Sequence, residues 1–269
     1  LQEKEGYTVI HPFNDPAVIA GQGTIGLEIL DQMPAVDVVL VPVGGGGLIS
    51  GVAFAIKKLH PECKVYGVQA AGAPSMKESL EKKEAITLGS VSTFADGIAV
   101  KHPGDLTFDL VSRYVDGVVT VTDDETACAV LALMEKQKLV TEGAGAVAVA
   151  AAMFGKVDLA GKKVVCLLSG GNIDVNILSR VITRGLVMAG RNSTLTLQLE
   201  DKPGQLKDVS EIISRCGGNV VRVHHNQSDT NMAITSCYLT VSMETRDKEQ
   251  VEEIKRELVK AGFQLISNT

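Results

Sequence analysis

The sequence predicts an α/β protein, in which a doubly wound, mostly parallel sheet is followed by a smaller ferredoxin-like unit of β-α-β-β-α-β order. Three observations predict this fold. A buried strand runs directly into four glycines and a helix over residues 38–59. Predicted strands and helices then alternate up to residue 188. From residue 191, apolar and polar residues alternate around two amphipathic helices. We therefore expect two domains, residues 1–190 and 191–269.

The first domain begins with a helix end at residues 1–5 and a short strand at residues 7–11. A helix is expected over residues 17–32, interrupted over residues 21–26 by a segment with three glycines, which suits close approach of another backbone or a ligand. Further helices are expected over residues 48–59, 106–114, 122–138, 145–154 and 175–188, and further strands over residues 38–43, 65–69, 117–121 and 164–168. Thr122 supplies a helix start because three acidic residues follow it in the first turn.

In the second domain, Leu195, Leu197 and Leu199 alternate with polar residues, as in a strand with one buried face. Strands are expected over residues 194–200, 219–227, 232–243 and 263–266, and helices over residues 205–216 and 247–261. Residues 228–231 form the predicted turn between the two middle strands.

The glycine segment is the strongest functional signal. It consists of Gly44, Gly45, Gly46 and Gly47. Without Cβ atoms, the N–H groups of such a segment can close around an anion. The following helix, beginning at Leu48, directs its positive end toward them. We interpret the segment as a phosphate-binding loop; a plain flexible turn is the alternative.

The surrounding residues indicate the kind of phosphate. A kinase-type loop would end in Gly-Lys-Ser/Thr, but Leu48 follows the last glycine. No register of the glycines satisfies Gly-x-Gly-x-x-Gly, and the next strand ends in Gln69 where a dinucleotide fold places an acidic residue. A small monophosphate therefore fits better than a nucleotide.

Composition excludes other classes of function. The net charge is −6, which disfavours nucleic acid and anionic membranes as partners. The five cysteines form no Cys-x-x-Cys pair, and we interpret them as reduced thiols of a cytoplasmic protein. No segment is long and apolar enough to be a spanning helix.

At this point three segments carry a specific resemblance. Residues 41–48, 20–24 and 168–172 resemble fold-type II pyridoxal phosphate enzymes, in particular the threonine ammonia-lyases (threonine dehydratases) and their serine racemase relatives. Residues 201–206 resemble the marker segment of ACT regulatory domains. The resemblance implies pyridoxal 5′-phosphate as cofactor, an amino acid as substrate, an amino acid as effector, and a homo-oligomer.

The resemblance also implies site residues. The cofactor-binding residues would be Gly44, Gly45, Gly46, Gly47, Leu48, Gly97, Glu142, Ser169 and Gly170, with Phe13 facing the substrate. Ser169 would hydrogen-bond the pyridine nitrogen; an ordinary capping serine is its alternative. Glu142 is as readily an acid placed before a helix, Gly97 a turn glycine and Phe13 a core residue. The regulatory ligand would contact Asp201, Pro203, Gly204, Gln205 and Leu206.

Two departures from the family pattern matter. No lysine here lies in the family's Schiff-base segment, so we expect that lysine upstream of residue 1 and a chain that is inactive alone. We interpret Lys57, Lys58, Lys162 and Lys163 as solvated charges at element ends. The serine racemase metal site would have its carboxylates at Gln69 and Ser75, so we expect no metal there. His224 and His225 cannot chelate together, because adjacent strand residues face opposite sides.

The function predicted from the sequence is that of a threonine ammonia-lyase, which forms 2-oxobutanoate and ammonia and serves amino-acid metabolism such as isoleucine biosynthesis. The alternatives are an amino-acid-sensing regulatory module, or a relative of L-serine dehydratase and serine racemase.

Overall fold

The computed structural model describes residues 2–227 and 233–268. The chain divides into two compact units, Leu1–Ser179 and Arg180–Thr269. The division falls within helix α8 (Val175–Met188), and so earlier than the boundary expected near residue 190. The expected boundary places all of α8 in the first domain, whereas the structure divides this helix after Ser179.

The first unit is built on a parallel four-stranded sheet with the order β3-β2-β1-β4. The strands are β1 (Val38–Pro42), β2 (Lys64–Ala70), β3 (Gly117–Val121) and β4 (Val164–Cys166). All five residues of β1 are buried, as a strand covered on both faces requires. The parallel doubly wound architecture predicted from the sequence is confirmed.

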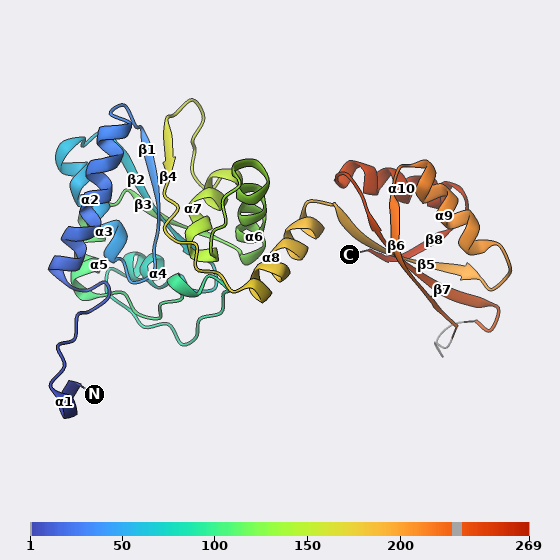
Figure 1. The fold of residues 1–269 in the computed structure, drawn as a ribbon, viewed down its shortest axis with the longest axis horizontal. Helices are drawn as coiled ribbons and strands as arrows, with labels where there is room; N and C mark the ends of the chain where they lie inside the picture. The colour runs from blue at the N-terminus through green and yellow to red at the C-terminus, as the bar shows by residue number, and fades with distance from the viewer. Residues whose placement is uncertain (1, 228–232, 269) are drawn as a thin grey trace. The chain divides into compact units, whose positions relative to one another are not determined.

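Helices cover both faces of this sheet (Figure 1). One face carries α2 (Pro16–Gln32), α3 (Gly47–Leu59), α4 (Ser75–Lys82) and α5 (Asp105–Tyr114), and the other carries α6 (Asp123–Ala132) and α7 (Gly143–Met153). The short helix α1 (Gln2–Glu5) and a 3₁₀ turn, η1 (Asp96–Ile98), complete the unit. The core forms where valines of β1 pack against Ile49, Val52 and Ile56 of α3.

The glycines of α2 permit close approach of α3, as expected. A Cβ atom on Gly23 would lie 3.3 Å from the Gly51 carbonyl oxygen, and one on Gly26 would lie 2.9 Å from that of Val52. These contacts leave little room for side chains at the two positions. The interruption expected over residues 21–26 was wrong, because the glycines pack against α3 within a continuous helix.

Two further expectations for this unit were wrong. Residues 7–11 form no strand, and Tyr7, Val9 and Ile10 are more than half exposed; in the described sheet no neighbouring strand pairs with them. The helix expected over residues 122–138 ends at Ala132 and widens into a π turn, η2 (Leu133–Gln137). Apolar periodicity does not distinguish this wider turn from an α-helix.

The second unit has a sheet with the order β6-β7-β5-β8, in which all three pairs are antiparallel. Its strands are β5 (Asn192–Glu200), β6 (Asn219–Asn226), β7 (Ser236–Glu244) and β8 (Gln264–Asn268), and its helices are α9 (Gln205–Arg215) and α10 (Lys248–Lys260). This is the predicted ferredoxin-like order. The predicted turn at residues 228–231 and the first residue of the predicted strand, Met232, lie outside the described residues.

Alternation divides β5 and β7 into a buried face and a more exposed face. Leu195, Leu197 and Leu199 pack with alternate residues of β7 against α9 and α10. In the described part of the chain, no helix has the length and apolar character needed to cross a membrane.

Candidate cofactor-binding site

A cavity of about 500 Å³ opens at the carboxyl ends of β1 and β4. In open α/β sheets, this is the edge at which ligands bind. The predicted residues that line the cavity are Phe13, Gly44, Gly45, Gly46, Gly47, Leu48, Gly97, Glu142 and Ser169. The structure thus brings together residues from five separate stretches of the chain.

The glycine loop has the geometry of an anion cradle. Gly46 adopts φ +96°, a left-handed conformation that favours glycine, and forms the N-cap of α3 without any side-chain cap. Within the described residues, the N–H groups of Gly44, Gly45, Gly46 and Gly47 donate to no backbone or side-chain acceptor. These groups and the N-terminus of α3 are therefore free to bind a phosphate.

Phe13 forms one wall of the loop. A Cβ atom on Gly45 would lie 2.4 Å from the Phe13 ring, and one on Gly47 would lie 2.8 Å from the Phe13 Cα. The ring is half-buried, lines the cavity and meets the His11 ring edge-on at 4.5 Å between centroids. Phe13 therefore packs against the loop and also lines the cavity; that it faces the substrate stays a prediction.

A buried threonine holds the loop from the side opposite the cavity. The Thr107 hydroxyl on α5 donates to the Gly45 carbonyl at 2.6 Å and lies 3.0 Å from the Gly104 carbonyl. The Asn14 side chain accepts a hydrogen bond from the Leu106 N–H at 3.1 Å, and so ties the segment that carries Phe13 to the start of α5. Sequence reasoning missed both residues, because each contact joins positions far apart in the chain.

Glu142 sits at the N-cap of α7, but its side chain makes no capping hydrogen bond. Its Oε1 atom instead lies between two glycines: a Cβ atom would be 3.5 Å from Oε1 if placed on Gly97, and 2.1 Å if placed on Gly170. The Glu142 N–H also donates to the Gly170 carbonyl at 3.2 Å. The carboxylate therefore faces the cavity wall, and Gly170 allows it to do so.

Ser169 follows β4 and is exposed in the cavity. The alternative that it caps the next helix is wrong, because the Asp174 carboxylate accepts from the N–H groups of Asn176 and Ile177 at the start of α8. The Ser169 hydroxyl remains available to a ligand.

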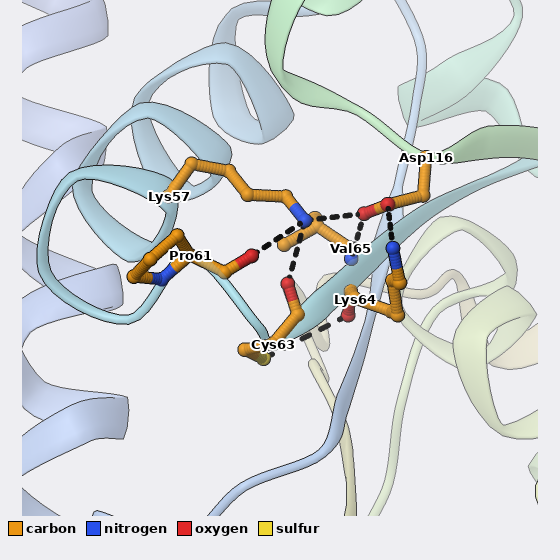
Figure 2. Close-up of polar contacts among 6 residues, drawn as sticks. All are labelled: Lys57, Pro61, Cys63, Lys64, Val65 and Asp116. Atoms are coloured by element: carbon orange, nitrogen blue, oxygen red, sulfur yellow. Dashed lines mark hydrogen bonds and ion pairs between the residues drawn. The ribbon is translucent and has the colours of Figure 1, made fainter.

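None of the lysines in the described part of the chain lines the cavity. Lys57 lies near the amino ends of β2 and β3, at the opposite edge of the sheet from the glycine loop (Figure 2). Its ammonium group is 2.7 Å from the Asp116 carboxylate and donates to the Cys63 carbonyl at 2.7 Å. The side chains of Lys57 and Asp116 are 16% and 17% exposed, so the expectation that Lys57 is a solvated charge was wrong.

The Asp116 carboxylate has three partners. Besides Lys57, it accepts from the Val65 N–H at 2.8 Å and from Lys64 at 3.0 Å. Desolvation opposes ionisation, but the hydrogen bonds from Lys57, Val65 and Lys64 outweigh it and hold the pKa of Asp116 below its usual value. This cluster is structural: it joins α3 to the starts of β2 and β3.

The segment from Gln69 to Ser75, which resembles a metal-binding segment in serine racemases, is a buried turn into α4. The Gln69 Oε1 atom accepts from the Lys77 N–H at 2.9 Å. The absence of a divalent cation here stays a prediction, which rests on the missing carboxylates.

The predicted regulatory residues belong to the second unit. Asp201, Pro203 and Gly204 follow β5, and Gln205 and Leu206 begin α9. Of these, Gln205 lines a cavity of about 440 Å³ beside β5, and Gly204 adopts φ +100°. Their regulatory role stays a prediction.

A further cavity, of about 560 Å³, lies between α2, α3 and α5. Apart from Thr24 and Lys58, its lining consists of apolar side chains and glycines. It lacks the convergent polar groups that would orient a phosphate.

The comparisons with known proteins agree with this geometry. A protein-family model described as "Pyridoxal-phosphate dependent enzyme" matches residues 1–170. The chain is 52% identical over 265 residues to an L-threonine ammonia-lyase of Thermotoga maritima, covering 98% of this chain and 66% of that protein. It is 45% identical to one of Geobacter sulfurreducens, covering 97% of this chain and 65% of that protein. The chain therefore spans slightly less than two thirds of the length of these relatives.

Solved structures give the same result. The processed form of threonine deaminase isoform 2 from Solanum lycopersicum matches 69% of this chain and 52% of its own, with a TM-score of 0.66 and 40% identity. Maize serine racemase matches 70% of this chain and 58% of its own, with a TM-score of 0.62 and 37% identity. The chain belongs to the family of pyridoxal-phosphate dependent enzymes.

Proposed function

We propose that this chain is the phosphate-binding and regulatory part of an L-threonine ammonia-lyase, which converts L-threonine to 2-oxobutanoate and ammonia. The observation that carries the proposal is the glycine loop, whose N–H groups lack acceptors within the described chain and whose residues line one cavity with Glu142 and Ser169. The identities of 52% and 45% to proteins named L-threonine ammonia-lyase support the choice of reaction.

The residues suit pyridoxal 5′-phosphate. The N–H groups of Gly44 to Gly47 and the positive end of α3 would bind its phosphate. The Ser169 hydroxyl would hydrogen-bond the pyridine nitrogen, and Gly97 would let the backbone lie beside the ring. When bound, the cofactor supplies an electron sink for the carbon next to the amino group of the substrate. Because the serine hydroxyl is neutral, the cofactor is a weaker electron sink than it would be with an acidic partner. A weaker electron sink suits loss of a β-hydroxyl group.

Glu142 and Phe13 would orient the ligand and shield it from water. Glu142 would position a polar group of the ligand from the wall opposite the glycine loop. Phe13 packs against the loop and would shield one side of the substrate from water. No lysine lines the cavity, so we propose that the Schiff-base lysine belongs to the part of the relatives' length that this chain does not match. The chain alone would then bind the cofactor without turning over threonine.

For the second unit we propose an ACT regulatory domain that binds an amino-acid effector through Asp201, Pro203, Gly204, Gln205 and Leu206. The ferredoxin-like order of the second unit supports this. Homo-oligomers and a place in isoleucine biosynthesis belong to the same proposal.

The second candidate is a serine racemase or serine dehydratase relative, which the similarity to maize serine racemase favours. The amide and hydroxyl at Gln69 and Ser75 favour the dehydratase, because Mg²⁺ prefers carboxylate ligands. Tight, stoichiometric Mg²⁺ binding in calorimetry that is lost in Gln69→Ala would favour the racemase.

The first experiment adds pyridoxal 5′-phosphate to the purified chain, reduces it with borohydride and measures the intact mass. We expect saturable binding in an absorbance titration, competition by inorganic phosphate, and no covalent adduct. A stoichiometric adduct on one lysine would show that the Schiff-base residue lies in this chain. The polypeptide encoded by the complete gene should then form 2-oxobutanoate from L-threonine; formation of D-serine from L-serine without 2-oxobutanoate would contradict the lyase.

A further inference from the structure

The second unit carries a cluster of three side chains, two of which, His225 and Cys237, have no part in the proposed function. Asp201, His225 and Cys237 lie where β5, β6 and β7 meet, at the end of the sheet next to the start of α9. Each offers one metal-ligating atom, and these atoms all lie within 4.8 Å of one another.

The strand register produces the cluster. Cys237 is paired with Leu199 of β5, and Asp201 lies two residues beyond Leu199. On the other side of β7, His225 is paired with Leu239, two residues beyond Cys237. Residues opposite each other or two apart share one face of a sheet, so Asp201 and His225 approach Cys237 diagonally from its two sides.

Backbone and side-chain hydrogen bonds hold the aspartate in place. The Asp201 N–H donates to the Thr235 carbonyl at 2.8 Å, just before β7. The Gln227 amide donates to Asp201 Oδ2 at 2.8 Å, which leaves Oδ1 for another partner. Partners of this kind orient the ligands of protein metal sites.

The chemistry of the three groups selects a class of cation. A thiol, an imidazole and a carboxylate match Zn²⁺ and its substitute Co²⁺, whereas Mg²⁺ and Ca²⁺ prefer oxygen ligands alone. Ligand atoms around a tetrahedral Zn²⁺, at about 2.0–2.3 Å from the ion, are about 3.5 Å apart. Asp201 and His225 are exposed, so rotation of their side chains can bring the ligand atoms closer together by the remaining distance of about 1 Å.

We propose that Asp201, His225 and Cys237 form a Zn²⁺ site with three protein ligands and a fourth position open to water or to a small ligand. Binding forms a metal–sulfur bond and releases the thiol proton of Cys237 to the solvent. His224 takes no part, because it is paired with Thr240 and faces the opposite side of the sheet, where Thr240 contacts Thr196.

The test is a titration of the chelator-treated, reduced 269-residue chain with Zn²⁺ by calorimetry, and with Co²⁺ by visible absorption. One site is expected, with a thiolate-to-cobalt charge-transfer band.

The variants are His225→Gln and Cys237→Ser, with His224→Gln and Cys216→Ser as matched controls. Each of the first two should weaken Zn²⁺ binding at least tenfold, and Cys237→Ser should abolish the charge-transfer band. The controls should retain both. His225 is exposed, so His225→Gln tests the site without disturbing the core even if Cys237→Ser fails to fold.

Three results would overturn the proposal. They are the absence of stoichiometric Zn²⁺ binding to the unsubstituted chain, equal losses in His224→Gln and His225→Gln, and a charge-transfer band that persists in folded Cys237→Ser.

Discussion

Substitution of Thr107 by valine tests whether the glycine loop is held by the buried hydroxyl on α5. Thr107 is fully buried, and its hydroxyl donates to the Gly45 carbonyl at 2.6 Å. Valine has nearly the same shape and leaves no cavity, so the substitution removes the hydrogen bond and little else.

The magnitude follows from what remains at each carbonyl. The Gly104 carbonyl also accepts from the Phe108 N–H at 2.8 Å and stays satisfied. The Gly45 carbonyl keeps only the Gly104 N–H at 3.4 Å, which is a long contact. A buried acceptor left poorly satisfied costs about 1–3 kcal/mol. We expect the free energy of unfolding to fall by about 2 kcal/mol, and the affinity for pyridoxal 5′-phosphate to fall roughly tenfold, which corresponds to about 1.4 kcal/mol.

The assay combines urea unfolding with absorbance titration of pyridoxal 5′-phosphate. Ser112→Ala is the matched control: Ser112 lies on the same helix, is exposed, and bonds only to the Phe108 carbonyl one turn earlier. It should change the free energy of unfolding by less than about 0.5 kcal/mol. Thr107→Ser should restore most of the affinity because it keeps the hydroxyl. If Thr107→Val binds the cofactor as tightly as Ser112→Ala does, the hydroxyl does not position the loop.

Three further predictions concern stability and reactivity. Gly21→Ala should raise the free energy of unfolding by up to about 1 kcal/mol in urea, because a Cβ atom there meets nothing within 4 Å, whereas Gly26→Ala should lower it by about 1–3 kcal/mol. Asp116→Asn should cost about 2 kcal/mol, against less than about 0.5 kcal/mol for Asp109→Asn in its exposed pair. Because the folded-state pKa of Asp116 is lowered, its contribution should be fully present above the unfolded-state pKa and disappear as the pH falls through the folded-state pKa. The two variants should therefore differ in stability at neutral pH and converge in acid; a pH series of unfolding curves in which the difference persists unchanged in acid would contradict this. Burial raises the pKa of Cys63 to about 11, so mass spectrometry should find it alkylated at neutral pH only after unfolding.

Local patterns were sufficient for most elements of the fold. The helices predicted over residues 48–59 and 175–188 and the strand predicted over residues 117–121 agree with α3, α8 and β3, because apolar periodicity and turn residues mark them locally. The strand predicted at residues 7–11 failed for a non-local reason. A strand exists only where another strand accepts its hydrogen bonds, and apolar residues such as Val9 and Ile10 carry no information about that neighbour.

Some residues of the candidate site were likewise predictable from local sequence, and others were not. The glycine loop and Ser169 were predictable because each lies just beyond the carboxyl end of an apolar strand, and the ends of parallel strands gather at one edge. Thr107 and Asn14 were not, because each acts on a backbone group in another element. Lys57 was misjudged for the same reason: its position at a helix end suggested a solvated charge, and only the packing of α3 against the start of β3 brings Asp116 to it.

The proposed zinc cluster combines a feature that is predictable from local sequence with one that depends on the pairing of strands. Alternation along β6 already places His224 and His225 on opposite faces, so sequence reasoning could exclude that pair as a chelate. Which of the two meets a cysteine depends on the register between β6 and β7. A shift of one residue would exchange the two histidines and would also turn Val220 and Val223 away from the side of β6 that is paired with the core residues Met243 and Val241. The apolar face of β6 therefore favours the observed register, and this register places His225 on the same face as Cys237. A register-shifting insertion in β6 should accordingly weaken Zn²⁺ binding and lower stability together, whereas His225→Gln should weaken binding without lowering stability.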